Sequence, residues 1–133
     1  MQRRQLATHA FAGAALAATL PFAAKAAAAD GEENVIFTAD DPGHWADVVA
    51  LHVPNVSVAG STLTVTTPHP MSAAHYIVSH TVVLAGGKFL DRHTFVPTDK
   101  PTSVHTLPAG YTGAVVITST CNLHDFWVKQ ITV

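Results

Sequence analysis

The chain has almost no cysteine, because Cys121 is the only one among its 133 residues. A single thiol cannot form a disulfide within the chain, so a fold stapled by internal disulfides is excluded. This matters because the sequence also carries features of an exported protein, and exported proteins meet an oxidising environment. We therefore expect Cys121 to be occupied by a ligand rather than free.

Basic residues are also scarce, with seven lysines and arginines against nine acidic residues. Removal of the first 29 residues would leave four basic residues against the same nine acidic ones, a net charge of −5. Nucleic acids and anionic membranes are bound through basic patches, so neither is an expected partner. The four remaining basic residues are Lys88, Arg92, Lys100 and Lys129.

The segment 1–29 has the composition of an export signal. It begins with the pair Arg3 and Arg4, continues through an alanine-rich apolar stretch at 10–24, and offers small residues around Lys25 for cleavage. The arginine pair resembles a twin-arginine signal. The apolar stretch is short and only weakly hydrophobic, so no stable membrane insertion is expected after cleavage. We predict a periplasmic protein whose folded domain is 30–133.

The remainder of the chain reads as short strands separated by turns, with no helical stretch of any length. Ala59 to Ser61 and Ala85 to Gly87 separate alternating segments and predict two hairpins. These features favour an all-β protein, an immunoglobulin-like β-sandwich of about seven strands. The predicted strand segments are 34–39, 55–58, 62–67, 76–84, 88–95, 103–107, 113–120 and 126–133.

Histidine and cysteine gather in three short segments between these strands. His52 lies in the first, His69 and His75 in the second, and Cys121 and His124 in the third. A soft thiolate with several imidazoles is a ligand set for iron, copper or zinc, and suits neither magnesium nor calcium. Three loops at one end of a sandwich could surround one ion, since functional groups often lie on loops of a rigid scaffold.

The spacing supports the same interpretation. On an extended strand Cys121 and His124 would face opposite sides, so the chain between them must bend. Between His69 and His75, Pro70 and a capping Ser72 favour one helical or 3₁₀ turn.

Three ordered motifs carry a family resemblance. They are His-Val-Pro at 52–54, Pro-His-Pro-Met-x-x-x-His-x-Ile at 68–77, and Cys-Asn-x-His-x-x-Trp at 121–127. Together they resemble the superoxide reductases, the neelaredoxin and desulfoferrodoxin group, from about His44 to the end of the chain. The resemblance implies one iron per chain with an axial cysteine and four histidines. By motif position these ligands are His52, His69, His75, Cys121 and His124.

The resemblance also implies an activity. Superoxide would be the substrate, reduced by one electron to hydrogen peroxide, with Cys121 and His124 as catalytic ligands and an external redox protein as electron donor. Related proteins often form dimers or tetramers, so a homo-oligomer is open. The accessory iron domain of longer members is excluded, because it needs four cysteines.

Two positions depart from the family pattern. Ala50 and Leu51 stand where the family usually has glutamate and lysine, so the glutamate that closes the open iron position and the lysine that attracts superoxide are absent. Asp125 stands where the family usually has glycine. Its carboxylate could orient His124, although we expect it to face water.

Other notable residues receive structural interpretations. We predict that His44, His80, His93 and His105 are not functional, since none has ligand spacing. Trp127 is expected in the core, where it could also shield the metal.

Three alternatives remain open from the residues alone. The first is an exported cupredoxin-like copper protein that carries electrons, although nothing after His124 is a methionine and Met71 precedes the cysteine. The second is a structural zinc site. The third is a binding module that carries a ligand on its cysteine.

Overall fold

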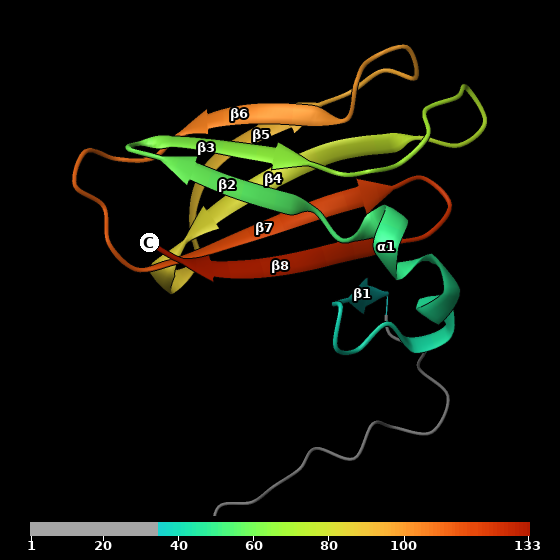
Figure 1. Ribbon diagram of the computed structural model, residues 1–133, viewed down its shortest axis with the longest axis horizontal. Coiled ribbons are helices and arrows are strands. Elements are labelled where there is room, and N and C mark those ends of the chain that lie inside the picture. The colour runs from blue at the N-terminus through green and yellow to red at the C-terminus, as the bar shows by residue number, and fades with distance from the viewer. Residues whose placement is uncertain (1–34) are drawn as a thin grey trace, which may run out of the picture. The chain divides into compact units, whose positions relative to one another are not determined.

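The computed structural model describes residues 35–133. They form a sandwich of one five-stranded and one three-stranded β-sheet (Figure 1). The predicted all-β sandwich is therefore confirmed. The predicted export signal and its boundary with the domain lie outside the described residues. In the described part, no helix is both long and apolar enough to cross a membrane.

The larger sheet has the strand order β1-β8-β7-β4-β5, and its strands pair antiparallel except for the parallel pair of β1 with β8. Its strands are β1 (Ile36–Phe37), β4 (Ile77–Leu84), β5 (Lys88–Thr94), β7 (Ala114–Cys121) and β8 (Phe126–Thr132). The smaller sheet is antiparallel, in the order β2-β3-β6. Its strands are β2 (Asn55–Ala59), β3 (Thr62–Thr66) and β6 (Thr102–Thr106).

Both predicted hairpins form. Ala59 pairs with Thr62, so a two-residue turn joins β2 to β3, and Gly60 takes a φ of 60° that favours glycine. A short 3₁₀ turn, η2 (Ala85–Gly87), joins β4 to β5. The described chain has eight strands rather than about seven, one in each of the eight predicted segments, although the opening segment contributes only the two-residue β1.

Residues 43–52, between β1 and β2, are helical, which corrects the prediction that no helical stretch exists. A 3₁₀ segment, η1 (Gly43–Val48), leads into one α-helical turn, α1 (Val49–His52). The apolar run before His52 has no turn residues and was compatible with either structure. His52 is therefore the last residue of a helical turn and not part of an irregular loop.

Strand alternation carries two rows of side chains into the interior. Every second residue of β7 faces inward, so that the buried residues run from Val115 through Ile117 and Ser119 to Cys121. In the facing sheet, Leu63 and Val65 of β3 are buried, and the alternation continues beyond the strand. It reaches the buried residues Thr67 and His69. Each row thus passes from aliphatic residues to a hydroxyl and then to a predicted ligand.

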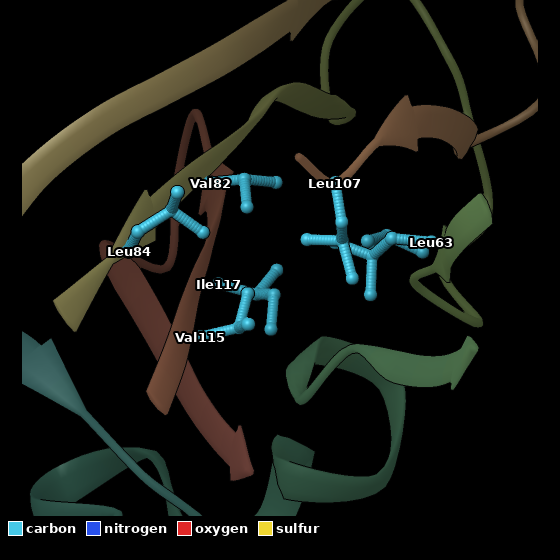
Figure 2. Close-up of a cluster of buried hydrophobic side chains, with 7 residues drawn as sticks. Leu63, Val82, Leu84, Leu107, Val115 and Ile117 are labelled. Carbon is cyan, nitrogen blue, oxygen red and sulfur yellow. The ribbon is translucent and has the colours of Figure 1, made fainter. Parts of the chain in front are cut away.

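The aliphatic part of the interior fills the middle of the sandwich. Figure 2 shows side chains from both sheets pointing toward one another, and all members of this cluster are at most 3% exposed. Burying a side chain of this kind contributes about 1.5–3 kcal/mol. The cluster consists of Leu63, Val65, Val82, Leu84, Leu107, Val115 and Ile117.

A second part of the interior is polar. Six side chains form one continuous hydrogen-bonded chain across the sandwich, with successive contacts of 2.7–2.8 Å. The chain begins at a buried serine and ends at a carboxylate on β5 whose side chain is 50% exposed. In order, it comprises Ser119, Thr67, His80, Ser103, His105 and Asp91.

The terminal carboxylate gives this buried chain a direction. Asp91 accepts from Nδ1 of His105, and this hydrogen bond lowers the pKa of Asp91. With His105 neutral, its Nε2 then carries a lone pair and accepts from Ser103. Ser103 in turn accepts from Nδ1 of His80, whose Nε2 accepts from Thr67. Every donor therefore points toward Asp91, and each of the six side chains in this hydrogen-bonded series has a hydrogen-bond partner.

Candidate metal centre

Three connections at one end of the sandwich bring the five predicted ligands together (Figure 1). His52 ends α1, His69 and His75 lie between β3 and β4, Cys121 ends β7, and His124 follows in the turn before β8. One potential ligand atom from each residue lies within 4.8 Å of all the others. The spatial grouping predicted from the sequence is therefore observed.

The four imidazole rings form a closed ring around a common centre. Neighbouring ring centroids are 4.4 Å apart for His69 and His75, 4.6 Å for His75 and His124, and 4.7 Å for His124 and His52. The circuit closes at 4.6 Å between His52 and His69. Across the centre, His52 and His75 are 6.2 Å apart. Such a square arrangement points one nitrogen of each ring inward.

The inward nitrogens face one another at short range. His75 Nε2 lies 3.1 Å from His69 Nε2 and 3.0 Å from His124 Nδ1, and His124 Nδ1 lies 2.9 Å from His52 Nε2. A ring nitrogen carries either one proton or one in-plane lone pair, so at most two of these three contacts can be hydrogen bonds. The remaining contact then has no free proton or lone pair left to form a hydrogen bond. A cation between the nitrogens would remove this conflict.

The distances also suit a transition metal. Histidine nitrogens bind such metals at about 2.0–2.1 Å, so two nitrogens at a right angle lie about 3 Å apart. The Cys121 sulfur is 3.9 Å from His69 Nε2 and 3.7 Å from His124 Nδ1, which are opposite corners of the square. A sulfur nearly equidistant from opposite corners fits a ligand near the axis of the square. The residues present therefore fit the iron that the family resemblance implies.

His52 is held in a metal-ready orientation by its surroundings. Its Nδ1 donates to the carbonyl of Val48 at 2.9 Å, which leaves Nε2 as the lone-pair nitrogen that faces the centre. The indole of Trp127 stacks on the His52 ring at 5.5 Å, and its N–H donates to the His124 carbonyl. Trp127 is fully buried, so the prediction of a core residue that also packs against the centre is confirmed.

Burial lowers the pKa of three of the clustered histidines and so favours their neutral form. It lowers the pKa of His69 to about 4, with further lowering from His52 and His75. The pKa of His52 is lowered mainly by burial, against the opposing effect of the Val48 carbonyl. The pKa of His124 is lowered by burial and by His75. Neutral rings present lone pairs, which metal binding requires.

The surroundings of Cys121 favour the protonated thiol, whereas a metal ligand must be a thiolate. The pKa of Cys121 is raised, mainly by burial and also by the Asp125 carboxylate, against the opposing effect of the backbone N–H groups of Leu123 and His124. The side chain is only 4% exposed. A bound cation would favour the thiolate, so metal binding would release this proton.

Asn122 joins the two ligand loops, a role that the sequence did not reveal. Its Oδ1 accepts from the backbone N–H of Tyr76 at 2.9 Å, and its Nδ2 donates to the carbonyl of Ala74 at 3.0 Å. The segment with His69 and His75 is thereby fastened to the turn after Cys121. The presence of asparagine inside the Cys-x-x-His spacing was the only signal available.

The segment between His69 and His75 forms a tight turn and not the helical or 3₁₀ turn that we predicted. Ser72 and His75 exchange backbone hydrogen bonds in both directions, at 2.9 and 3.2 Å. The hydroxyl of Ser72 also accepts from the N–H of His75 at 3.1 Å, so the predicted cap is present. This turn presents His75 from the opposite side of the cluster to His52.

Asp125 does not simply face water, which corrects our expectation. Its Oδ2 accepts a hydrogen bond of 2.8 Å from the indole N–H of Trp45. The same oxygen lies 3.9 Å from Nε2 of His44. The Trp45 ring in turn meets the ring of His124 edge-on, with centroids 4.5 Å apart. The residue after the last ligand is thus part of its surroundings.

The four remaining histidines of the described chain lie outside the cluster, as predicted. His80 and His105 belong to the buried hydrogen-bonded chain and are 0% and 2% exposed. His93 contacts Phe95 at 4.6 Å, and His44 lies beside Trp45.

Residues 44–130 match the family model described as desulfoferrodoxin, which is well over half of the chain. The chain belongs to the desulfoferrodoxin family. The resemblance inferred from the three motifs is therefore confirmed. No curated protein sequence matches the chain.

Solved structures agree with this family. A variant of the superoxide reductase (neelaredoxin) from Ignicoccus hospitalis is 26% identical with a TM-score of 0.67, covering 74% of this chain and 93% of that one. The superoxide reductase from Treponema pallidum is 25% identical with a TM-score of 0.53, covering 60% and 66%. A one-iron superoxide reductase from Giardia intestinalis, at 19% identity and a TM-score of 0.56, covers 62% and 97% and shows the fold alone.

Proposed function

We propose that this member of the desulfoferrodoxin family is a superoxide reductase with one mononuclear iron. In the proposed reaction, one superoxide anion takes up one electron and two protons and becomes hydrogen peroxide. The iron that the clustered residues would hold would supply this one-electron chemistry, and an external redox protein would be the source of the electron. The observation that carries the proposal is the square of four imidazoles with a thiol near its axis. The superoxide reductases among the structural neighbours support the same activity.

The five clustered residues would hold the iron, through nitrogens of His52, His69, His75 and His124 and the sulfur of Cys121. When bound, iron supplies one-electron chemistry, and a thiolate ligand donates electron density to it. His52 and His69 are 1% and 6% exposed, so they close the inner side of the cluster. His75 and His124 are only half-buried, so solvent and a small anion approach from their side.

Two positions beside the cluster set the surroundings of this open side. Ala50 and Leu51 precede His52 on α1 and are exposed, and neither can bind a metal or attract an anion. We therefore expect that no carboxylate from this segment would close the site in its oxidised form. We also expect weak electrostatic attraction of superoxide, because residues 30–133 carry a net charge of −5 and superoxide is an anion.

The geometry favours iron over the alternatives that the sequence left open. A blue-copper site takes two histidines and one cysteine with a weak axial ligand, and structural zinc takes four ligands. This cluster offers five donors. The sulfur of Met71, the only candidate thioether nearby, accepts from the N–H of Ile77 at 3.3 Å. The thiol of Cys121 lies among four imidazoles, and this position also disfavours a binding module that carries a ligand on its cysteine.

The first test is metal analysis of the isolated domain, with visible spectra before and after oxidation. About one iron per chain, colourless when reduced and blue or green when oxidised, would support the proposal and lead to a superoxide assay. Copper with an intense blue band would replace it with an electron carrier. Zinc, or no bound metal, would leave a structural or binding role.

Two further parts of the proposal concern the cell. We propose that residues 1–29 direct export to the periplasm, by the twin-arginine route, which carries folded proteins. The electron donor would then be a periplasmic redox protein. Fractionation of cells that produce the full chain, compared with a variant in which Arg3 and Arg4 are lysine, tests this placement. Equal export of the two would argue against the twin-arginine route.

A further inference from the structure

Asp125 adopts a backbone conformation that is unusual for its side chain. Its φ is 65°, and it is the one residue other than glycine with positive φ in the described part of the chain. This left-handed region disfavours residues with a Cβ atom, although aspartate and asparagine tolerate it better than most. Glycine would adopt the same turn without strain. An aspartate at this position therefore calls for a compensating contact.

The compensating contact is made by the carboxylate. Oδ2 of Asp125 accepts from Nε1 of Trp45 at 2.8 Å, although the two residues are 80 positions apart. The side chain of Asp125 is 33% exposed, so this hydrogen bond is partly shielded from water. Trp45 lies at a kink within η1, with a φ of −98° and a ψ of 22°. The hydrogen bond thus fixes the indole of a residue whose backbone is irregular.

Trp45 transmits this restraint to a metal ligand. Its indole meets the imidazole of His124 edge-on, with an interplanar angle of 74° and a centroid distance of 4.5 Å. His52 differs, because it is oriented by a hydrogen bond from its outer nitrogen to the Val48 carbonyl. His124 faces the centre through Nδ1, and its outer nitrogen makes no hydrogen bond to any described residue. Packing must therefore set the plane of the His124 ring.

We propose that Asp125 is a positioning residue that acts through Trp45 to fix the ring plane of His124. The inference rests on the proposed function only in taking His124 as a metal ligand. Without the carboxylate, the indole would lose its hydrogen bond and the ring of His124 would be free to rotate. Groups that orient a metal ligand typically contribute 10-fold to 100-fold to metal affinity.

The test is Co²⁺ binding to the metal-free domain, followed by the ligand-field and thiolate-to-metal bands of the loaded protein. Asp125→Gly removes the carboxylate and relieves the strained backbone, so it should not lower the thermal midpoint. We expect it to weaken Co²⁺ binding about 10-fold or more and to shift the ligand-field bands. Trp45→Phe keeps a ring but removes the donor, and should give the same result. The double variant should be no worse than either single variant.

Two controls separate positioning from other effects. Asp125→Asn tolerates the left-handed backbone and keeps an oxygen acceptor for the indole, so it should retain the wild-type bands. Asp47→Asn removes a charge from an exposed site on η1 and should change nothing. Wild-type affinity and bands in Asp125→Gly would overturn the proposal, and so would bands in Asp125→Asn that match those of Asp125→Gly.

The outcome does not depend on superoxide chemistry. If the wild-type domain binds Co²⁺ through thiolate and imidazole but does not reduce superoxide when loaded with iron, only the proposed function fails. If His124→Ala leaves Co²⁺ binding unchanged, then His124 is not a ligand, and the proposed site and the positioning role fail together.

Discussion

The hydroxyl oxygens of Thr67 and Ser119 lie 2.7 Å apart across the interior of the sandwich. Each residue stands two positions before a predicted ligand, Thr67 before His69 and Ser119 before Cys121. Because inward-facing residues alternate along the chain, the hydroxyl pair lies one step deeper than the ligand pair in both rows. The contact therefore links the two sheets just below the metal centre.

Replacing Thr67 with valine keeps the size of the side chain but removes this link. The Ser119 hydroxyl and His80 Nε2 would both lose a buried partner. We expect the free energy of unfolding to fall by about 1–3 kcal/mol, the cost of leaving buried polar groups unsatisfied. Urea unfolding measures the change. Thr64→Val on the same sheet is the control, and an equal effect of both variants would contradict the prediction.

Asn122→Ala should weaken metal binding without removing a ligand. The variant loses the hydrogen bonds to the Tyr76 N–H and the Ala74 carbonyl that fasten the two ligand loops. We expect Co²⁺ affinity to fall about 10-fold to 100-fold, as when groups that orient metal ligands are removed. The neighbouring residue Leu123 is 55% exposed, so Leu123→Ala serves as control. Unchanged affinity in Asn122→Ala would show that the loops hold their positions without it.

Cys121→Ser should abolish the visible colour of the oxidised iron protein. The charge-transfer band requires a sulfur ligand, and an alcohol oxygen donates far less electron density to iron. We also expect most of the superoxide reductase activity to disappear. Visible spectroscopy and a superoxide assay on iron-loaded protein provide the two readouts. A variant that keeps both would refute the role of the thiolate.

Stability should decrease in mild acid because of His80. Burial, with smaller effects of His105 and His93, lowers the pKa of His80 from 6.5 to about 3. Below pH 6.5 the unfolded chain therefore binds a proton at this position, whereas the folded chain does not until about pH 3. Unfolding becomes easier as the pH falls through this range, by at most about 1.4 kcal/mol per pH unit for one proton.

His80→Gln provides the comparison, because an amide can donate and accept but does not titrate. Urea unfolding of both proteins between pH 7.5 and 4.5 should give a shallower dependence on pH for the variant. Ligand histidines with lowered pKa values contribute to both proteins alike, so the difference isolates His80. Parallel curves would contradict the assignment.

The sequence predicted the sandwich and the five clustered residues well, for identifiable reasons. Alternating segments and glycine turns are local signals, and they located the strands to within a few residues. The five clustered residues could be found because a metal site requires particular residue types, and these residues stand at short spacings in the sequence. His69 and His75, for example, are six positions apart on one turn, and Cys121 and His124 flank a bend.

The contacts that support the ligands could not be predicted in the same way. The hydrogen bond from Trp45 to Asp125 joins residues 80 positions apart, and nothing in the local sequence marks either as a partner. His80 resembled an ordinary strand residue, because its partners come from β6 and the end of β3. The helical turn before His52 was missed because α1 has only four residues, too few to show a helical period in the sequence.

The series of hydrogen-bonded side chains from Ser119 to Asp91 also affects the electrostatic field in the core. Its hydrogen bonds all point the same way, so their dipoles add, with the positive ends toward the carboxylate at the surface. None of the inner members can be reversed alone, because each is a donor to one neighbour and an acceptor from the other. The interior therefore has a polarity set at the surface, and the charge on Asp91 selects it.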